Sequence, residues 1–224
     1  MRQDISFPSR MIGGIHQKLL LVAVIISLIM IGMNVVYAFN YDWYYEEVYK
    51  WDEAAIVFLQ VLNFILIVTY LIWLTRVHQA MRLKFKHYPI TPIMGLVRMI
   101  PLVHLWGIID TYLRLSLFFR KIPELEKRGR LVKGTLIIMF SLLLIVPSLN
   151  SFLTKSDPND VWMPISYMAD SLLIISYYVM TKLVSSTLAL LFVSPESEGF
   201  DYNPAYEAAL AYNQQQYVQD NSSR

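Results

Sequence analysis

The stretch that decides the fold is LLLVAVIISLIMIGMNVVYAFNY, residues 19–41, which contains no Asp, Glu, Lys or Arg. A helix of about 20 apolar residues crosses the roughly 30 Å hydrocarbon core of a bilayer, so this run is long enough to span a membrane. It is also longer than the apolar region of a secretion signal, and no A-x-A cleavage site follows it. The run therefore predicts a retained transmembrane helix.

Three more apolar runs follow along the chain. Residues 54–74 form the second, residues 134–153 the third, and the fourth lies within residues 161–193, with 162–182 as its expected limits. The chain is 56% hydrophobic and 16% charged, whereas about 25% of the residues in soluble domains are charged. The sequence therefore predicts an all-α polytopic integral membrane protein, with four transmembrane helices arranged as two hairpins within residues 19–193.

The charged residues are unevenly distributed along the chain. Residues 75–133, between the two hairpins, hold 12 of the 19 Lys and Arg residues against three acids, and the N-terminal arm, residues 1–18, is also basic. The expected loop at residues 42–53 instead holds five acids and one Lys, together with aromatic residues suited to the membrane surface. Because cytoplasmic loops carry the excess of Lys and Arg, we predict that both termini and residues 75–133 face the cytoplasm.

The basic central segment is expected to contain a bend followed by an amphipathic helix. Pro92 and Pro101 interrupt any continuous helix, because each proline lacks an N–H donor and restricts the residue before it. From residue 102 onward, polar positions recur at helical spacing among apolar residues: His104, Gly107, Thr111 and Arg114. Asp110 lies four residues before Arg114 and is placed to pair with it.

Two placements of this segment fit the pattern. A narrow polar stripe on a wide apolar helix is typical of a helix in the membrane interface, with basic residues such as Arg98 and Arg114 near anionic headgroups. Alternatively, residues 88–106 form a re-entrant segment whose backbone is buried in protein. The interfacial placement is the first prediction, and Pro101 marks the bend in both.

Two short motifs resemble a known family. WLTRVHQAM, residues 73–81, is followed by TPIMGLVRMIPLVHLW, residues 91–106. Together they resemble the bacterial membrane-protein family called domain of unknown function 4328, through Trp73, Leu74, Arg76 and His78, and then Ile100, Pro101, Leu105 and Trp106. His104 stands where that family has Asn, and the family's extra tryptophans before Ile100 are missing. The resemblance implies a four-helix protein of the bacterial inner membrane and brings no known activity.

Polar side chains within the predicted spans form the candidate site, because ionisable groups are rare in hydrocarbon and usually functional. The candidates are Asp170, Lys182, Asn63 and Asn34. If the fourth helix crosses at residues 162–182, Asp170 is deep and Lys182 reaches the cytoplasmic surface. If it crosses at residues 171–193, Lys182 is central and Asp170 lies at the outer surface. The sequence leaves both registers open, and in the first Asp170 could bind a proton or a cation with help from Asn34 or Asn63.

The sequence offers no recognisable catalytic chemistry. It contains no Cys, and its four His residues do not have the spacing of metal-ligand motifs. It also contains no P-loop, no GxGxxG and no Gly-x-Ser-x-Gly. We therefore expect no cofactor, no metal and no enzymatic activity.

The function predicted first is that of a membrane scaffold or an accessory subunit of a larger complex. The alternative is a small oligomeric ion channel or transporter with Asp170 near its pathway. The expected partners are anionic lipid headgroups, further copies of this chain or other membrane proteins, and a cytoplasmic protein that binds the acidic tail, residues 194–224. No nucleic-acid partner is expected.

Overall fold

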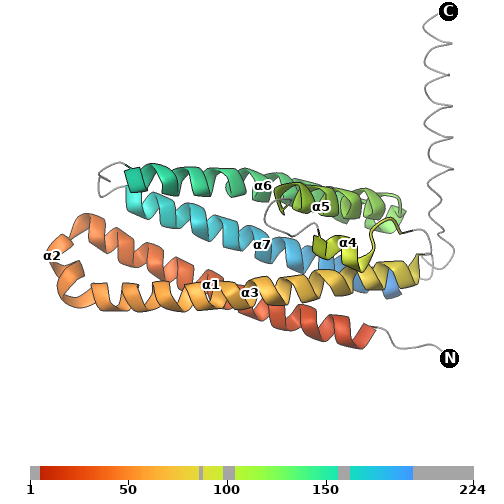
Figure 1. The fold of residues 1–224 in the computed structure, drawn as a ribbon, viewed down its shortest axis with the longest axis horizontal. Helices are drawn as coiled ribbons and strands as arrows, with labels where there is room; N and C mark the ends of the chain where they lie inside the picture. Colours follow the sequence, from red (N-terminus) through yellow and green to blue (C-terminus); the bar gives the residue numbers. More distant parts are fainter. Residues whose placement is uncertain (1–5, 86–87, 98–103, 156–161, 194–224) are drawn as a thin grey trace, which may run out of the picture.

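The structure is a computed structural model that describes residues 6–85, 88–97, 104–155 and 162–193. Every regular element in these ranges is helical (Figure 1): α1 (Ser6–Phe39), α2 (Tyr41–Trp43), η1 (Tyr44–Val48), α3 (Tyr49–Lys84), α4 (Pro92–Val97), α5 (His104–Arg120), η2 (Pro123–Leu125), α6 (Glu126–Lys155) and α7 (Trp162–Val193). Four of the helices are long and apolar enough to cross a membrane. The predicted all-α class with four candidate spans is confirmed.

The long helices lie side by side along one axis in two hairpins, α1 with α3 and α6 with α7 (Figure 1). Helix α7 joins the hairpins, because it packs extensively against both α1 and α6. The buried face of α1 follows alternating spacings of four and three residues: His16, Leu20, Ala23, Ser27, Met30 and Asn34. This spacing is typical of helices that pack at a small crossing angle.

The expected loop at residues 42–53 is helical. Asn40 ends α1 and reverses the chain, and its side-chain Oδ1 accepts a hydrogen bond from the backbone N–H of Trp43 at 3.3 Å. A short π-helical segment, η1, then leads directly into α3. Asn is a favoured N-cap because its carbonyl oxygen satisfies a free N–H at a helix start. The hairpin tip is therefore a compact helical turn.

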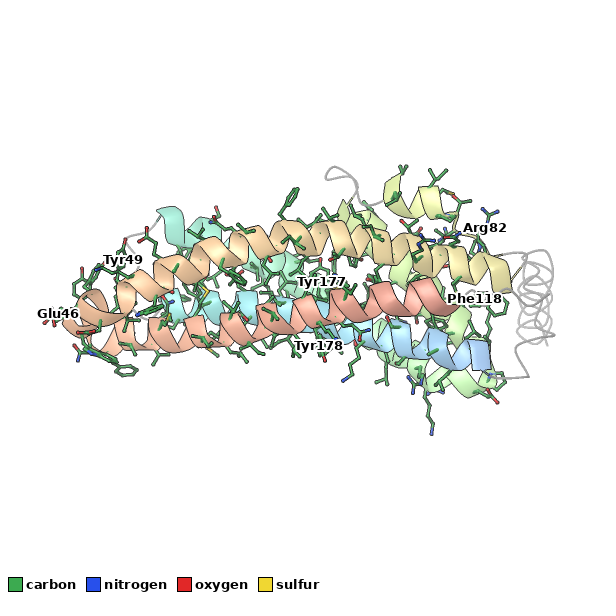
Figure 2. All side chains as sticks on the ribbon, turned by 90° about the horizontal axis from the view of Figure 1, so that it is seen from below. Glu46, Tyr49, Arg82, Phe118, Tyr177 and Tyr178 are labelled. Atoms are coloured by element: carbon green, nitrogen blue, oxygen red, sulfur yellow. The ribbon has the colours of Figure 1, made fainter. Side chains whose placement is uncertain are left out.

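The two ends of the bundle differ in charge. Figure 2 shows Glu46 and Tyr49 at the end that contains this tip, and Arg82 and Phe118 toward the opposite end. We name them the acidic end and the basic end. Helices α1 and α3 contain 34 and 36 residues, or about 51 and 54 Å at 1.5 Å per residue. Both exceed the roughly 30 Å hydrocarbon core, so each extends past it.

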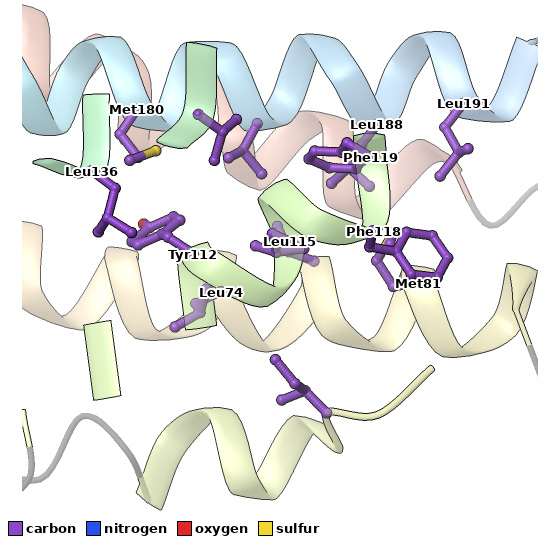
Figure 3. Close-up of a cluster of buried hydrophobic side chains, with 14 of the residues drawn as sticks. Leu74, Met81, Tyr112, Leu115, Phe118, Phe119, Leu136, Met180, Leu188 and Leu191 are labelled. Atoms are coloured by element: carbon purple, nitrogen blue, oxygen red, sulfur yellow. The ribbon is translucent and has the colours of Figure 1, made fainter. Parts of the chain in front are cut away.

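A hydrophobic core fills the basic end, where α5 joins the long helices. Helix α5 turns back through η2 and lies along the first half of α6 (Figure 1). The side chains that it contributes meet those of α3, α6 and α7 (Figure 3): Leu74, Met81, Tyr112, Leu115, Phe118, Phe119, Leu136, Met180, Leu188 and Leu191. Burial of one such side chain contributes roughly 1.5–3 kcal/mol. Packing in this core therefore positions α5.

Helix α5 is more buried in the protein than its polar stripe predicts. Gly107 and Thr111, which belong to the stripe expected to face water, are both buried. The hydroxyls of Tyr112 and Tyr70 lie 2.8 Å apart, and α5 begins eight residues before Tyr112, about 12 Å along the helix. Helix α5 therefore packs beside residues of the predicted second span. Both placements of this segment, interfacial and re-entrant, stay predictions.

Candidate functional site

A buried carboxylate lies near the hairpin tip at the acidic end. Asp52, in the first turn of α3, is 4% exposed. The phenol of Tyr44 donates a hydrogen bond to its Oδ2 at 2.5 Å. Its Oδ1 is buried and has no hydrogen-bond partner among the described residues. Burying a carboxylate oxygen that has no hydrogen-bond partner costs free energy, unless a cation or a proton donor compensates its charge.

Helices α1 and α7 complete this site, which we name the acidic-end cluster and define as Asn34, Tyr44, Asp52, Tyr167 and Asp170. Tyr167 lies close to Asn34 and within electrostatic range of Asp52 and Asp170. Asn34 is buried, and its Nδ2 donates to the backbone carbonyl of Met30 at 3.0 Å. Asp170 is partly buried one helical turn after Tyr167. The cluster therefore combines two carboxyl groups with neutral oxygen ligands.

Asp170 and Lys182 lie at different levels along α7. Trp73, at the end of the predicted second span, donates from its indole Nε1 to Ser185 Oγ at 3.1 Å. Asp170 precedes Ser185 by 15 residues, so it lies about 22 Å from that level along the helix. Lys182 is exposed, with its Nζ 5.7 Å from the centroid of the Tyr178 ring. Asp170 therefore lies toward the acidic end and Lys182 nearer the basic end, and both belong to the candidate span Trp162–Leu191. The two registers of the fourth span stay predictions.

The two amide candidates are placed differently. Asn34 is buried and belongs to the acidic-end cluster. Asn63 does not, because it is exposed on the surface of α3. Gln60 lies one turn before it on the same exposed face. Gln60 is not among the predicted site residues, although a polar residue three positions from another within a predicted span is a visible signal.

A second group of polar and aromatic side chains joins α1, α3 and α7 nearer the basic end. Trp73 is 2% exposed and stacks on the His16 ring at a centroid distance of 6.0 Å. His16 Nδ1 lies 2.9 Å from Thr69 Oγ1. Trp73 and His16 are therefore packing residues with satisfied polar atoms. Buried Trp and His side chains usually make such contacts.

His78, the last of the matching residues in the first family-like motif, supports α4. Its Nδ1 lies 2.9 Å from the Tyr88 hydroxyl, and the two rings stack at a centroid distance of 5.8 Å. A Cβ atom on Gly95 of α4 would lie 2.6 Å from His78 Cδ2. The close approach of α4 to His78 therefore requires glycine at position 95, because any side chain there would collide with the ring.

The remaining candidates lie on or near α4 and α5. Arg114 donates to Asp110 at 2.7 Å, as their spacing predicted, and an exposed pair of this kind contributes about 0.3–0.5 kcal/mol. Pro92 is the first residue of α4. Arg98, Pro101 and the side chain of His104 lie outside the described residues, as does the tail at residues 194–224.

The acidic-end cluster contains three residues that the sequence analysis did not select: Tyr44, Asp52 and Tyr167. Five acids occupy residues 42–53, and nothing in their spacing marks Asp52 as the buried one. Among the described residues, no group of three or more His, Cys, Asp or Glu is arranged to hold a metal ion. Comparison with known protein families, curated proteins and solved structures finds no match to this chain.

Proposed function

We propose that this polytopic membrane protein is a non-enzymatic scaffold or accessory subunit that binds another transmembrane helix along α3. The observation that carries the proposal is the position of Gln60 and Asn63, whose amides are exposed on the surface of a helix long and apolar enough to cross a membrane. No hydrogen bond to either side chain is present among the described residues. The amides therefore require a partner from outside the described fold.

The surroundings of the two amides are strongly apolar. Phe64 is 70% exposed, and other exposed side chains on this half of α3 are Val57, Phe58, Val61, Ile65, Ile67 and Val68. An amide without a hydrogen-bond partner in hydrocarbon costs several kcal/mol, because no water is present to replace the missing bond. Asn and Gln side chains in membranes commonly pair across helices, with a stabilisation of about 0.6–2 kcal/mol. A second helix satisfies both amides at once.

The packing of α3 explains why this face is open. Helix α3 packs mainly against α1 and α4, and α4 and the core around α5 lie toward the basic end (Figure 1). The half of α3 near the acidic end has α1 as its main neighbour. The chain therefore leaves one side of a spanning helix uncovered, with polar groups in its middle.

Charge suggests the orientation of the complex. The Lys and Arg excess of residues 75–133 supports placing the basic end in the cytoplasm. In that orientation, the open face of α3 lies toward the outer leaflet, while the basic residues meet anionic headgroups and the acidic tail is available to a cytoplasmic partner. The inner membrane of a bacterium is the location that the family resemblance supports.

The test is to replace Gln60 and Asn63 together with Leu and to purify the tagged chain gently from its native membrane. We expect the wild-type chain to elute with other membrane proteins, or with further copies of itself, in a fixed ratio. The double variant should lose those partners and migrate as a smaller species on native gels. Its own fold should persist, because leucine on a lipid-facing surface is favourable.

A matched control is Ser141→Leu on α6. Ser141 is also polar and exposed within a candidate span, but its hydroxyl already donates to the carbonyl of Ile137 at 3.0 Å. We expect this variant to keep every partner. If the Gln60/Asn63 double variant retains the same partners in the same ratio, the α3 face is not the binding surface and the proposal fails.

A further inference from the structure

The acidic-end cluster draws oxygen-bearing side chains from three long helices and from η1. Asp52 comes from α3, Tyr44 from η1, and Tyr167 and Asp170 from α7, while Asn34 comes from α1. Tyr44 donates a hydrogen bond to Asp52 at 2.5 Å and interacts electrostatically with Tyr167, which links the hairpin tip to α7. Every one of these side chains carries an oxygen that can coordinate a hard cation.

Two buried polar atoms, one on α3 and one on α7, lack a hydrogen-bond partner. Asp52 Oδ1 is buried with no hydrogen bond, and so is the hydroxyl of Ser171, which follows Asp170 and is 2% exposed. Among the described residues, no Lys or Arg forms an ion pair with Asp52. Burying a carboxylate without a counter-charge is costly, and the cost falls sharply when a cation is coordinated. Asp52 Oδ1 is therefore a buried carboxylate oxygen that no positively charged group among the described residues compensates.

We propose that the acidic-end cluster binds one monovalent alkali cation, with Asp52 Oδ1 as its charged ligand and oxygens of Tyr167, Asn34 and Asp170 around it. Asp52 is the carboxylate of the cluster that has a buried oxygen without a partner, and its single negative charge calls for a single positive charge. Asp170 is only partly buried. The scarcity of clustered acids described above argues against a divalent site, which needs more carboxylate ligands. This inference is independent of the proposed helix-binding face on α3.

The first experiment measures thermal unfolding of the purified full-length protein in detergent, at constant ionic strength, in NaCl, KCl or choline chloride. A ligand that binds only the folded state raises the unfolding temperature, and saturation should shift it by about 5 °C. We expect Na⁺ or K⁺ to stabilise the protein relative to choline. Asp52→Asn should abolish that difference, and Asp170→Asn should weaken it.

Asp42→Asn is the matched control, because Asp42 lies in the same hairpin tip and is exposed. It should keep the full response to the cation. Equal stability in all three salts would overturn the proposal, as would an unchanged response in Asp52→Asn. Stabilisation by Ca²⁺ alone would overturn the assignment to a monovalent cation.

A second measurement covers the possibility that Asp52→Asn fails to fold. Binding of radioactive ²²Na⁺ to the wild-type protein is measured in choline buffer, with excess unlabelled NaCl or KCl as competitor. We expect about one displaceable ion per chain, lost in Asp170→Asn at low Na⁺ concentration and retained in Asp42→Asn. The absence of displaceable binding at millimolar Na⁺, together with no thermal shift, refutes the site.

Discussion

Trp73→Ala is expected to lower the free energy of unfolding by about 3–5 kcal/mol, the usual cost of truncating a buried large aromatic side chain. Trp73 contacts His16 of α1 and donates to Ser185 of α7, so it links three of the four long helices. Its removal leaves a cavity and an unpaired hydroxyl at the same point. The measurement is an unfolding titration with a denaturing detergent in mixed micelles.

Two variants separate the sources of this effect. Trp73→Phe keeps one six-membered ring but loses the N–H donor and part of the buried ring volume, so we expect it to cost less than Trp73→Ala, about 1–2 kcal/mol. Trp106→Ala is the control for the loss of a tryptophan as such, because Trp106 is 74% exposed on α5. That variant should change the free energy of unfolding by about 0.5 kcal/mol or less. Similar losses in Trp73→Ala and Trp106→Ala would contradict this account of the core.

Gly129→Ala is expected to destabilise the protein by about 1–3 kcal/mol, through overpacking between α5 and α6. A Cβ atom at Gly129 would lie 2.8 Å from the carbonyl oxygen of Ser116 and 2.9 Å from the backbone nitrogen of Arg120. Backbone atoms cannot move aside as a flexible side chain can. The hydrogen bond from Ser116 Oγ to the carbonyl of Gly129, 2.8 Å long, would also be strained.

Gly134→Ala provides the matched control on the same helix. Nothing lies within 4 Å of a Cβ built at Gly134, and alanine favours a helix over glycine by about 1 kcal/mol. We expect this variant to be neutral or more stable than the wild type. Opposite signs for the two substitutions, measured by thermal unfolding in the same detergent, would support the close packing of α5 on α6. If Gly129→Ala were stabilising, α5 and α6 would be packed less closely than described.

Much of the fold follows from local sequence signals. Uncharged apolar runs predict the long helices because their length matches the hydrocarbon core, and Asn40 is a favoured residue for the cap at the hairpin tip. The Asp110–Arg114 pair follows from helical spacing alone. Asp170 was a candidate because an acid within a span is rare. These features depend on residues a few positions apart, so the sequence contains them directly.

The features that depend on contacts between distant residues needed the tertiary structure. The stripe through Gly107 and Thr111 is expected to face water, but both residues are buried in the protein, where α5 packs mainly against α6. The periodicity of α5 shows which residues share a face, yet it cannot show whether protein, lipid or water covers that face. His78 illustrates the same limit, because its partner Tyr88 and its neighbour Gly95 lie beyond the end of its own helix.

The sequence by itself determined the helical class, the four candidate spans and the segregation of charge between the two ends, because these depend on composition and on spacing along one helix. The tertiary structure decided which polar residues are buried and which are exposed. Five acids of the hairpin tip look alike in the sequence, but only Asp52 is buried there. Asn34 and Asn63 are both amides within spans, but only Asn34 faces the bundle. Burial depends on which helix packs alongside, and packing joins residues that are far apart in the chain.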